Sequence, residues 1–118
     1  MRVLIADDSR DVRTVLRLVL AQDGHEVVGE ATDGRDAIGR AEASQPDYVI
    51  LDEDMPGLDG MAALPEIHRV APEARIVLYS ANETIDLTAE AQKAGAVGVV
   101  DKLQGPLALS ALLARSAG

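Results

Sequence analysis

A short segment in the middle of the chain reads Tyr48-Val49-Ile50-Leu51-Asp52, an apolar run closed by a carboxylate. A buried parallel strand has this pattern when its carboxyl end opens into a site. Three other short apolar runs lead to polar or charged residues in the same way. They are residues 3–6 before Asp7 and Asp8, residues 76–79 before Ser80, and residues 97–100 shortly before Lys102. The sequence therefore predicts several buried strands whose ends carry the chemistry.

Segments with helical spacing separate these runs, and residues 27–31 form a weaker, more polar run that suits an edge strand. The apolar positions of the five expected helices are Val12, Val15, Leu16, Val19 and Leu20; Ala37, Ile38 and Ala41; Met61, Leu64 and Ile67; Leu87, Ala91 and Ala94; and Leu109, Leu112 and Leu113. Five strand–helix units in succession predict an α/β fold. We expect a doubly wound (βα)5 sandwich, flavodoxin-like, with a five-stranded parallel sheet of order 2-1-3-4-5.

In that strand order, strands one, three, four and five are neighbours, roughly 5 Å apart. Their ends bring together three carboxylates, one hydroxyl and one ammonium, from Asp7, Asp8, Asp52, Ser80 and Lys102. This set suits a divalent cation together with a phosphoryl group. Without the cation, the carboxylates repel one another, so the pKa of at least one of them should be raised.

Composition excludes several classes of function. The 118 residues carry a formal charge of −9, and because nucleic-acid affinity depends on Lys and Arg, direct nucleic-acid binding is not expected. Aromatic residues make up only 2%, which leaves little for stacking nucleobases. The chain has no cysteine, hence no disulfide or thiolate metal site. No apolar run is long enough to span a bilayer or form a signal-peptide core, so no membrane contact and a cytoplasmic location are expected.

With these residues in place, the chain resembles a response-regulator receiver domain of two-component signalling over its whole length. The resemblance rests on four segments in order, which are residues 6–9, residues 52–60, Tyr79-Ser80-Ala81 and Lys102. It implies that Asp52 accepts a phosphoryl group from a sensor histidine kinase or a phosphotransfer protein. It also implies that Asp8 and Asp52 bind Mg²⁺ directly, Asp7 through water and Asp54 through its backbone carbonyl. Ser80 and Lys102 would contact the phosphoryl oxygens.

Two other functions fit parts of the pattern. A small phosphatase of the haloacid dehalogenase type would use Asp52 as a nucleophile, with Asp52-Glu53-Asp54 as its Asp-x-Asp signature. Three features argue against this class of phosphatase. Met55 stands where its signature usually has Thr or Val, and the acidic pair Asp7-Asp8 comes before the nucleophile strand, whereas that family places its acidic pair last. The chain also has no room for a cap domain. A receiver-like module that binds partners without phosphorylation is the other alternative, although the complete acidic and lysine set argues against it.

Four positions depart from the family pattern. Val99 stands where strand five usually carries an aromatic switch residue, and Leu103 stands where a proline often follows the lysine. Because valine is short and stiff, we expect the switch to act through residues 81–94 instead. Asp54 adds a carboxylate near the acceptor, where it should favour cations and repel anionic donors. Pro65 lies inside the expected third helix, so that helix should start late or bend there.

The length predicts one domain, residues 1–118, either a stand-alone receiver or the receiver part of a longer regulator with a C-terminal output domain. Its output would then be a fused domain or a partner protein. The last helix is a candidate surface for a homodimer.

Overall fold

The computed structural model describes residues 1–81 and 87–117. Five parallel strands form one sheet in the order β2-β1-β3-β4-β5, which confirms the predicted topology. The elements along the chain are β1 (Arg2–Ala6), α1 (Arg10–Gln22), β2 (Glu26–Ala31), α2 (Gly34–Ser44), β3 (Tyr48–Asp52), α3 (Gly60–Val70), β4 (Arg75–Ser80), α4 (Thr88–Lys93), β5 (Ala96–Asp101), a short 3-10 turn (Lys102–Gln104) and α5 (Pro106–Ala117). The predicted strands and helices are all present, with ends that differ by a residue or two.

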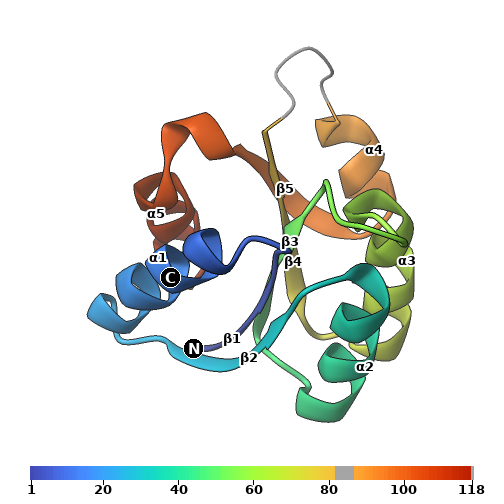
Figure 1. Ribbon diagram of the computed structural model, residues 1–118, viewed down its shortest axis with the longest axis horizontal. Helices are drawn as coiled ribbons and strands as arrows, with labels where there is room; N and C mark the ends of the chain where they lie inside the picture. The colour runs from blue at the N-terminus through green and yellow to red at the C-terminus, as the bar shows by residue number, and fades with distance from the viewer. Residues whose placement is uncertain (82–86, 118) are drawn as a thin grey trace.

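The sheet is the middle of three layers, with α1 and α5 on one face and α2, α3 and α4 on the other (Figure 1). Successive residues of a strand point to opposite faces, so each strand contributes to both cores. In β1, for example, Leu4 belongs to the core beneath α2–α4, while Val3 and Ile5 belong to the core beneath α1 and α5. Both cores are mainly aliphatic, as the scarcity of aromatic residues predicts.

The register of the sheet sets the position of the polar strand ends. Ala6, the last residue of β1, pairs with Leu51, and Asp52 pairs with Tyr79 at the end of β4. Ser80 pairs with Asp101, directly before Lys102. The carboxyl ends of the four neighbouring strands therefore reach the same edge of the sheet, as a parallel arrangement requires.

The expectation for α3 is partly wrong. The helix does not start late, because it begins at Gly60, and Pro65 lies in its interior. The early start has a local cause: the Asp59 side chain accepts a hydrogen bond from the Ala62 N–H, which caps the first turn. Pro65 is on the exposed side of the helix, and because it has no N–H it cannot donate a backbone hydrogen bond to the Met61 carbonyl. A bend at Pro65 stays a prediction.

The expected route of the switch concerns Val99 of β5 and residues 81–94 before it. Val99 is half-buried and packs against the core beneath α2–α4. Of the segment expected to transmit the switch, residues 82–86 lie outside the described residues, while α4 is present as a short helix of six residues. Among its residues only Ala91 is fully buried, so the helix has a small packed face.

Candidate functional site

Asp52 is the buried centre of the site. It closes β3, and its side chain is only 2% exposed. The following loop turns sharply back, so that the Asp54 N–H donates to Asp52 Oδ1 over 3.1 Å. The loop then returns so closely that a Cβ on Gly60 would lie 2.2 Å from the Asp52 carbonyl oxygen. Glycine at this position is therefore what lets the start of α3 pack against the acceptor strand.

The acidic pair lies beside Asp52 at the end of β1. Asp7 is buried and Asp8 is exposed. The Ser9 N–H donates to Asp7 Oδ1 over 2.9 Å, and Ser9 in turn caps α1 by accepting from the Val12 N–H. One carboxylate oxygen from each of Asp7, Asp8 and Asp52 can be chosen so that all three lie within 4.8 Å of one another. The structure thus brings the three predicted carboxylates together.

Lys102 reaches into this cluster from the far end of β5. Its Nζ lies 2.8 Å from Asp52 Oδ1 and 3.0 Å from Asp7 Oδ2, and its side chain is 20% exposed. The turn that places it is capped by Asp101, whose side chain accepts from the Leu103 N–H. The ammonium also lies 5.5 Å from the centre of the Tyr79 ring, a favourable place for a cation. Lys102 therefore contacts both buried carboxylates of the site, those of Asp7 and Asp52.

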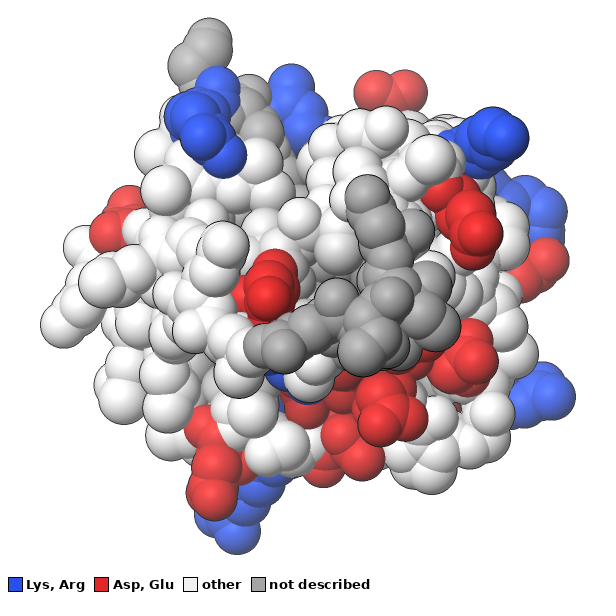
Figure 2. Space-filling model, turned by 90° about the horizontal axis from the view of Figure 1, so that it is seen from above, with Lys and Arg blue, Asp and Glu red and all other residues white. Residues whose placement is uncertain are grey.

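Ser80 ends β4 one residue beyond Tyr79, the residue that pairs with Asp52, and it is buried. Its position at the same sheet edge is the one that the strand order predicts, and the role of its hydroxyl stays a prediction. Asp54 is exposed, consistent with a place at the mouth. Acidic side chains gather on the face seen from above in Figure 2, the face at which these strands end.

Burial is the main reason that the pKa of Asp52 rises from 3.8 to about 6. The hydrogen bond from Lys102 opposes this rise, and the charge of Asp7 adds to it. The predicted direction is confirmed, but loss of solvent outweighs the repulsion between carboxylates that the prediction invoked. For Lys102, burial lowers the pKa, yet the hydrogen bonds and charges of Asp52 and Asp7 outweigh it, so the pKa lies above its usual value.

These carboxylates fit a divalent cation. Three carboxylates against one ammonium leave an excess of two negative charges, which such a cation would cancel. Asp7 Oδ2 is buried, and apart from the Lys102 ammonium 3.0 Å away no hydrogen-bond donor is found for it within the described part of the chain. A buried carboxylate oxygen with an unfilled bonding direction suits a cation or its bound water.

A pH series should reveal the cost of burying Asp52. Because the pKa of Asp52 is raised in the folded state, the folded protein binds more protons than the unfolded chain between pH 4 and 6. The contribution of Asp52 to the free energy of unfolding therefore falls as the pH rises through that window. A pKa rise of about two units corresponds to roughly 2.7 kcal/mol of unfolding free energy. Screening by solvent at the exposed edge of the site reduces this value to about 1–2 kcal/mol. In chelator, Asp52→Asn should therefore gain stability over wild type between pH 4 and 7. Denaturant unfolding measures the gain; a difference independent of pH would contradict this assignment.

Comparison with known proteins places the chain in a family. The family described as "Response regulator receiver domain" matches residues 3–114. The chain belongs to the response-regulator receiver domains. This membership covers nearly the whole chain, and it favours the receiver over the phosphatase of the haloacid dehalogenase type.

Individual proteins with a receiver domain are similar to this chain in sequence. "Chemotaxis protein CheY" of Thermotoga maritima is 40% identical over 86% of this chain and 84% of its own length. "Transcriptional regulatory protein PdtaR" of Mycobacterium tuberculosis is 42% identical over 95% of this chain, which spans only 53% of that protein. A "Protein-glutamate methylesterase/protein-glutamine glutaminase 5" of Myxococcus xanthus is 45% identical over 86% of this chain but only 30% of its own length. In the two longer relatives, the matched receiver is therefore one part of the protein.

Solved structures agree in fold. Chemotaxis protein CheY4 of Vibrio cholerae has a TM-score of 0.85 at 28% identity, covering 97% of this chain and 96% of that one. The CheX-CheY-BeF3-Mg+2 complex of Borrelia burgdorferi contains a chain with a TM-score of 0.76 at 31% identity, covering 86% of this chain and 78% of that one.

Across the described residues, no helix is both long and apolar enough to cross a membrane.

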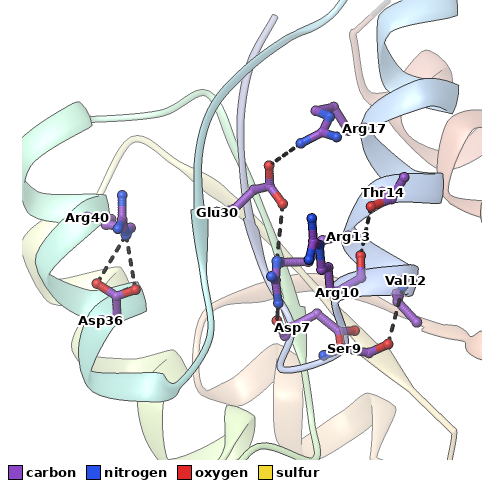
Figure 3. Close-up of polar contacts among 10 residues, drawn as sticks. All are labelled: Asp7, Ser9, Arg10, Val12, Arg13, Thr14, Arg17, Glu30, Asp36 and Arg40. Carbon is purple, nitrogen blue, oxygen red and sulfur yellow. Dashed lines mark hydrogen bonds and ion pairs between the residues drawn. The ribbon is translucent and has the colours of Figure 1, made fainter.

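Sequence reasoning did not identify one group of residues beside the site. Arg13 of α1 donates to the backbone oxygen of Asp7 over 2.9 Å and pairs with Glu30 of β2. Arg13 and Glu30 are 17 residues apart, and nothing in the periodicity of either segment indicates that they meet. Only the packing of α1 across β1 and β2 brings them together (Figure 3).

Proposed function

We propose that this receiver domain is a phosphorylation-dependent signalling switch, with Asp52 as the phosphoacceptor. The observation that carries the proposal is the contact of one ammonium, Lys102, with both Asp52 and Asp7 inside a cluster of three carboxylates. A carboxylate can attack an anionic phosphoryl group only if the repulsion between them is cancelled. Asp52 meets that need, because it is buried beside the Lys102 ammonium in a carboxylate cluster that suits a divalent cation.

In the reaction, a carboxylate oxygen of Asp52 attacks the phosphorus of a phosphohistidine on a histidine kinase or a phosphotransfer protein. The O–P bond forms as the N–P bond breaks, and the histidine nitrogen keeps the bonding electrons and takes up a proton. Lys102 lies where its ammonium can balance the charge on the incoming phosphoryl oxygens. Ser80 supplies a hydroxyl for those oxygens from the end of the neighbouring strand.

The cofactor that suits this site is Mg²⁺, held directly by Asp8 and Asp52, through water by Asp7, and by the backbone carbonyl of Asp54. When bound, it supplies positive charge that offsets repulsion between the acceptor and the phosphoryl oxygens. The exposure of Asp8 leaves a side of the cluster open to solvent, which suits an ion that keeps several waters.

The domain, residues 1–118, would pass the signal on by a change in its interaction surface, read by a fused output domain or by a partner protein, including a second copy of the chain. Its negative charge argues against direct contact with nucleic acid, and we place its action in the cytoplasm, away from the membrane. Apart from forming and losing its own aspartyl phosphate, it would catalyse nothing.

The test is a count of turnovers. We would incubate the protein with excess acetyl phosphate and Mg²⁺, weigh it intact, and measure the phosphate released. A receiver gains one phosphoryl group per chain and releases phosphate slowly. Rapid release over many turnovers would support a phosphatase, and no mass gain with Mg²⁺ present would support an interaction module that works without phosphorylation.

Asp54 should tune the site without being essential. We expect Asp54→Asn to be phosphorylated a few-fold faster by acetyl phosphate and to need a few-fold more Mg²⁺, because an exposed anion near the mouth repels the donor and attracts the cation. Initial rates across a Mg²⁺ series at low salt measure both effects. Glu42→Gln removes an exposed charge on α2 and serves as the control; an equal change in both variants would contradict a local effect.

The route of the switch can be measured by amide hydrogen exchange. Val99 is too short to exchange a surface position for an interior one, whereas α4 is short and has a small packed face. Beryllofluoride with Mg²⁺ should therefore change exchange rates in α4 more than in β5. Larger changes in β5, around Val99, would show that strand five still transmits the signal.

A further inference from the structure

The side chain of Arg13 connects three elements next to the site. It is 14% exposed, and its Nε lies 3.1 Å from Glu30 Oε1 on β2. Its Nη1 donates to the backbone oxygen of Asp7, at 2.9 Å, in the loop between β1 and α1. The other oxygen of Glu30 pairs with Arg17 at 2.7 Å, so both oxygens of that carboxylate are engaged (Figure 3).

This cluster differs from an ordinary surface ion pair. Arg13 is mostly buried and Glu30 is 27% exposed, so water competes with their contact less than at the open surface. The Arg40–Asp36 pair on α2, drawn at the left of Figure 3, is the contrasting case: both partners belong to one helix, and their side chains are 50% and 37% exposed. The Arg13 guanidinium instead joins a helix, an edge strand and a loop.

The loop that Arg13 contacts carries both members of the acidic pair. Asp7 donates its N–H to the Ala31 carbonyl, its side chain accepts from the Ser9 N–H, and its carbonyl accepts from Arg13. These three hydrogen bonds determine the orientation of the peptide that links Asp7 to Asp8. Within the described parts of the chain, no hydrogen bond or ion pair is found for the Asp8 carboxylate, so its direction depends on its backbone.

We propose that Arg13, oriented by Glu30, is a positioning residue for the divalent-cation site. By fixing the peptide between Asp7 and Asp8, it directs the exposed Asp8 carboxylate toward the cluster that it forms with Asp7 and Asp52. The proposal rests on the function proposed above, because it concerns the same cation. It follows the general pattern in which groups around a metal site orient the ligands that bind the ion.

A purely structural role would have a different signature. If Arg13 only joined α1 to β2, its loss would lower the free energy of unfolding and leave cation affinity unchanged in the folded protein. A positioning role instead weakens cation binding and loosens the loop before any cation is present. The affinity for Mg²⁺ and the exchange rate of the Ser9 amide, whose N–H donates to Asp7, separate the two roles.

The experiment compares Arg13→Lys and Glu30→Gln with wild type and with Arg40→Lys, which makes the same replacement in the exposed pair on α2. Isothermal titration calorimetry gives the Kd for Mg²⁺, and NMR gives Ser9 amide exchange in chelator. We expect a roughly tenfold weaker Kd for Arg13→Lys and a smaller loss for Glu30→Gln, as for other groups that orient metal ligands. Ser9 exchange should quicken in both variants, and Arg40→Lys should match wild type.

Acetyl phosphate labelling at saturating Mg²⁺ should recover most of the wild-type rate in Arg13→Lys, because positioning affects binding of the ion more than the attack itself. An unchanged Kd in both Arg13→Lys and Glu30→Gln would overturn the proposal while leaving the receiver function intact. If Arg13→Lys does not fold, Glu30→Gln alone decides. Failure of wild type to bind Mg²⁺ and to become phosphorylated would instead refute the proposed function, and this inference with it.

Discussion

Asp52→Asn should gain no phosphoryl group from acetyl phosphate and Mg²⁺, whereas wild type gains one per chain. The amide lacks the anionic oxygen that attacks phosphorus, and the site holds no other carboxylate placed as Asp52 is, 2.8 Å from Lys102 at the end of β3. Asp7 is also buried beside Lys102, but it follows β1, which is not adjacent to β4 and its Ser80. Intact mass spectrometry measures the loss.

Asp54→Asn is the matched control, since it makes the same chemical change two residues away at an exposed position. It should still gain one phosphoryl group. Unfolding in chelator shows that Asp52→Asn is folded, because that variant should be at least as stable as wild type at pH 7. Equal mass gain in Asp52→Asn and wild type would remove Asp52 as the acceptor.

Gly60→Ala should lower the free energy of unfolding by about 3 kcal/mol or more. The new Cβ would lie 2.2 Å from the carbonyl oxygen of Asp52 and 2.8 Å from the Cα of Glu53, and both are backbone atoms that cannot rotate away. The start of α3 would have to move, and the loop that supports Asp52 would move with it. We therefore expect weaker Mg²⁺ binding in whatever fraction remains folded.

Gly39→Ala provides the control for that substitution. Gly39 lies inside α2, and nothing lies within 4 Å of a Cβ built there. Because alanine favours helix over glycine, this variant should gain up to about 1 kcal/mol. Denaturant unfolding of both variants under one set of conditions checks the pair, and similar losses in the two would contradict the packing argument at Gly60.

The fold and the main site could be predicted because parallel strands end at a common edge. The apolar runs before Asp7, Asp52 and Ser80 indicate buried strands, and their alternation with helices predicts a doubly wound sheet, for which the common five-strand order is the one that the structure has. Once that order is known, the meeting of Asp7, Asp8, Asp52 and Lys102 follows from it. The structure adds their distances and shows that Lys102 contacts the two buried carboxylates.

Other features depend on packing that no local pattern encodes. Gly57 and Gly60 both follow Asp52 in the sequence, but the sequence alone does not show that each is glycine for a different reason. Gly57 has a positive φ of 74°, whereas Gly60 is required by close contact with the Asp52 backbone. The start of α3 before Pro65 likewise depends on the Asp59 cap and this contact. The Arg13–Glu30 pair depends on how α1 crosses the sheet.

The most direct test of the central claim is to locate the phosphoryl group itself. We would treat the protein with acetyl phosphate, with Mg²⁺ or with chelator, and reduce any acyl phosphate with borohydride, which converts a phosphorylated aspartate to homoserine. Peptide mass spectrometry then finds the marked residue. We predict homoserine at position 52 only, and only in the sample with Mg²⁺; a mark at Asp7, Asp8 or Asp54, or equal marking in chelator, would contradict the account.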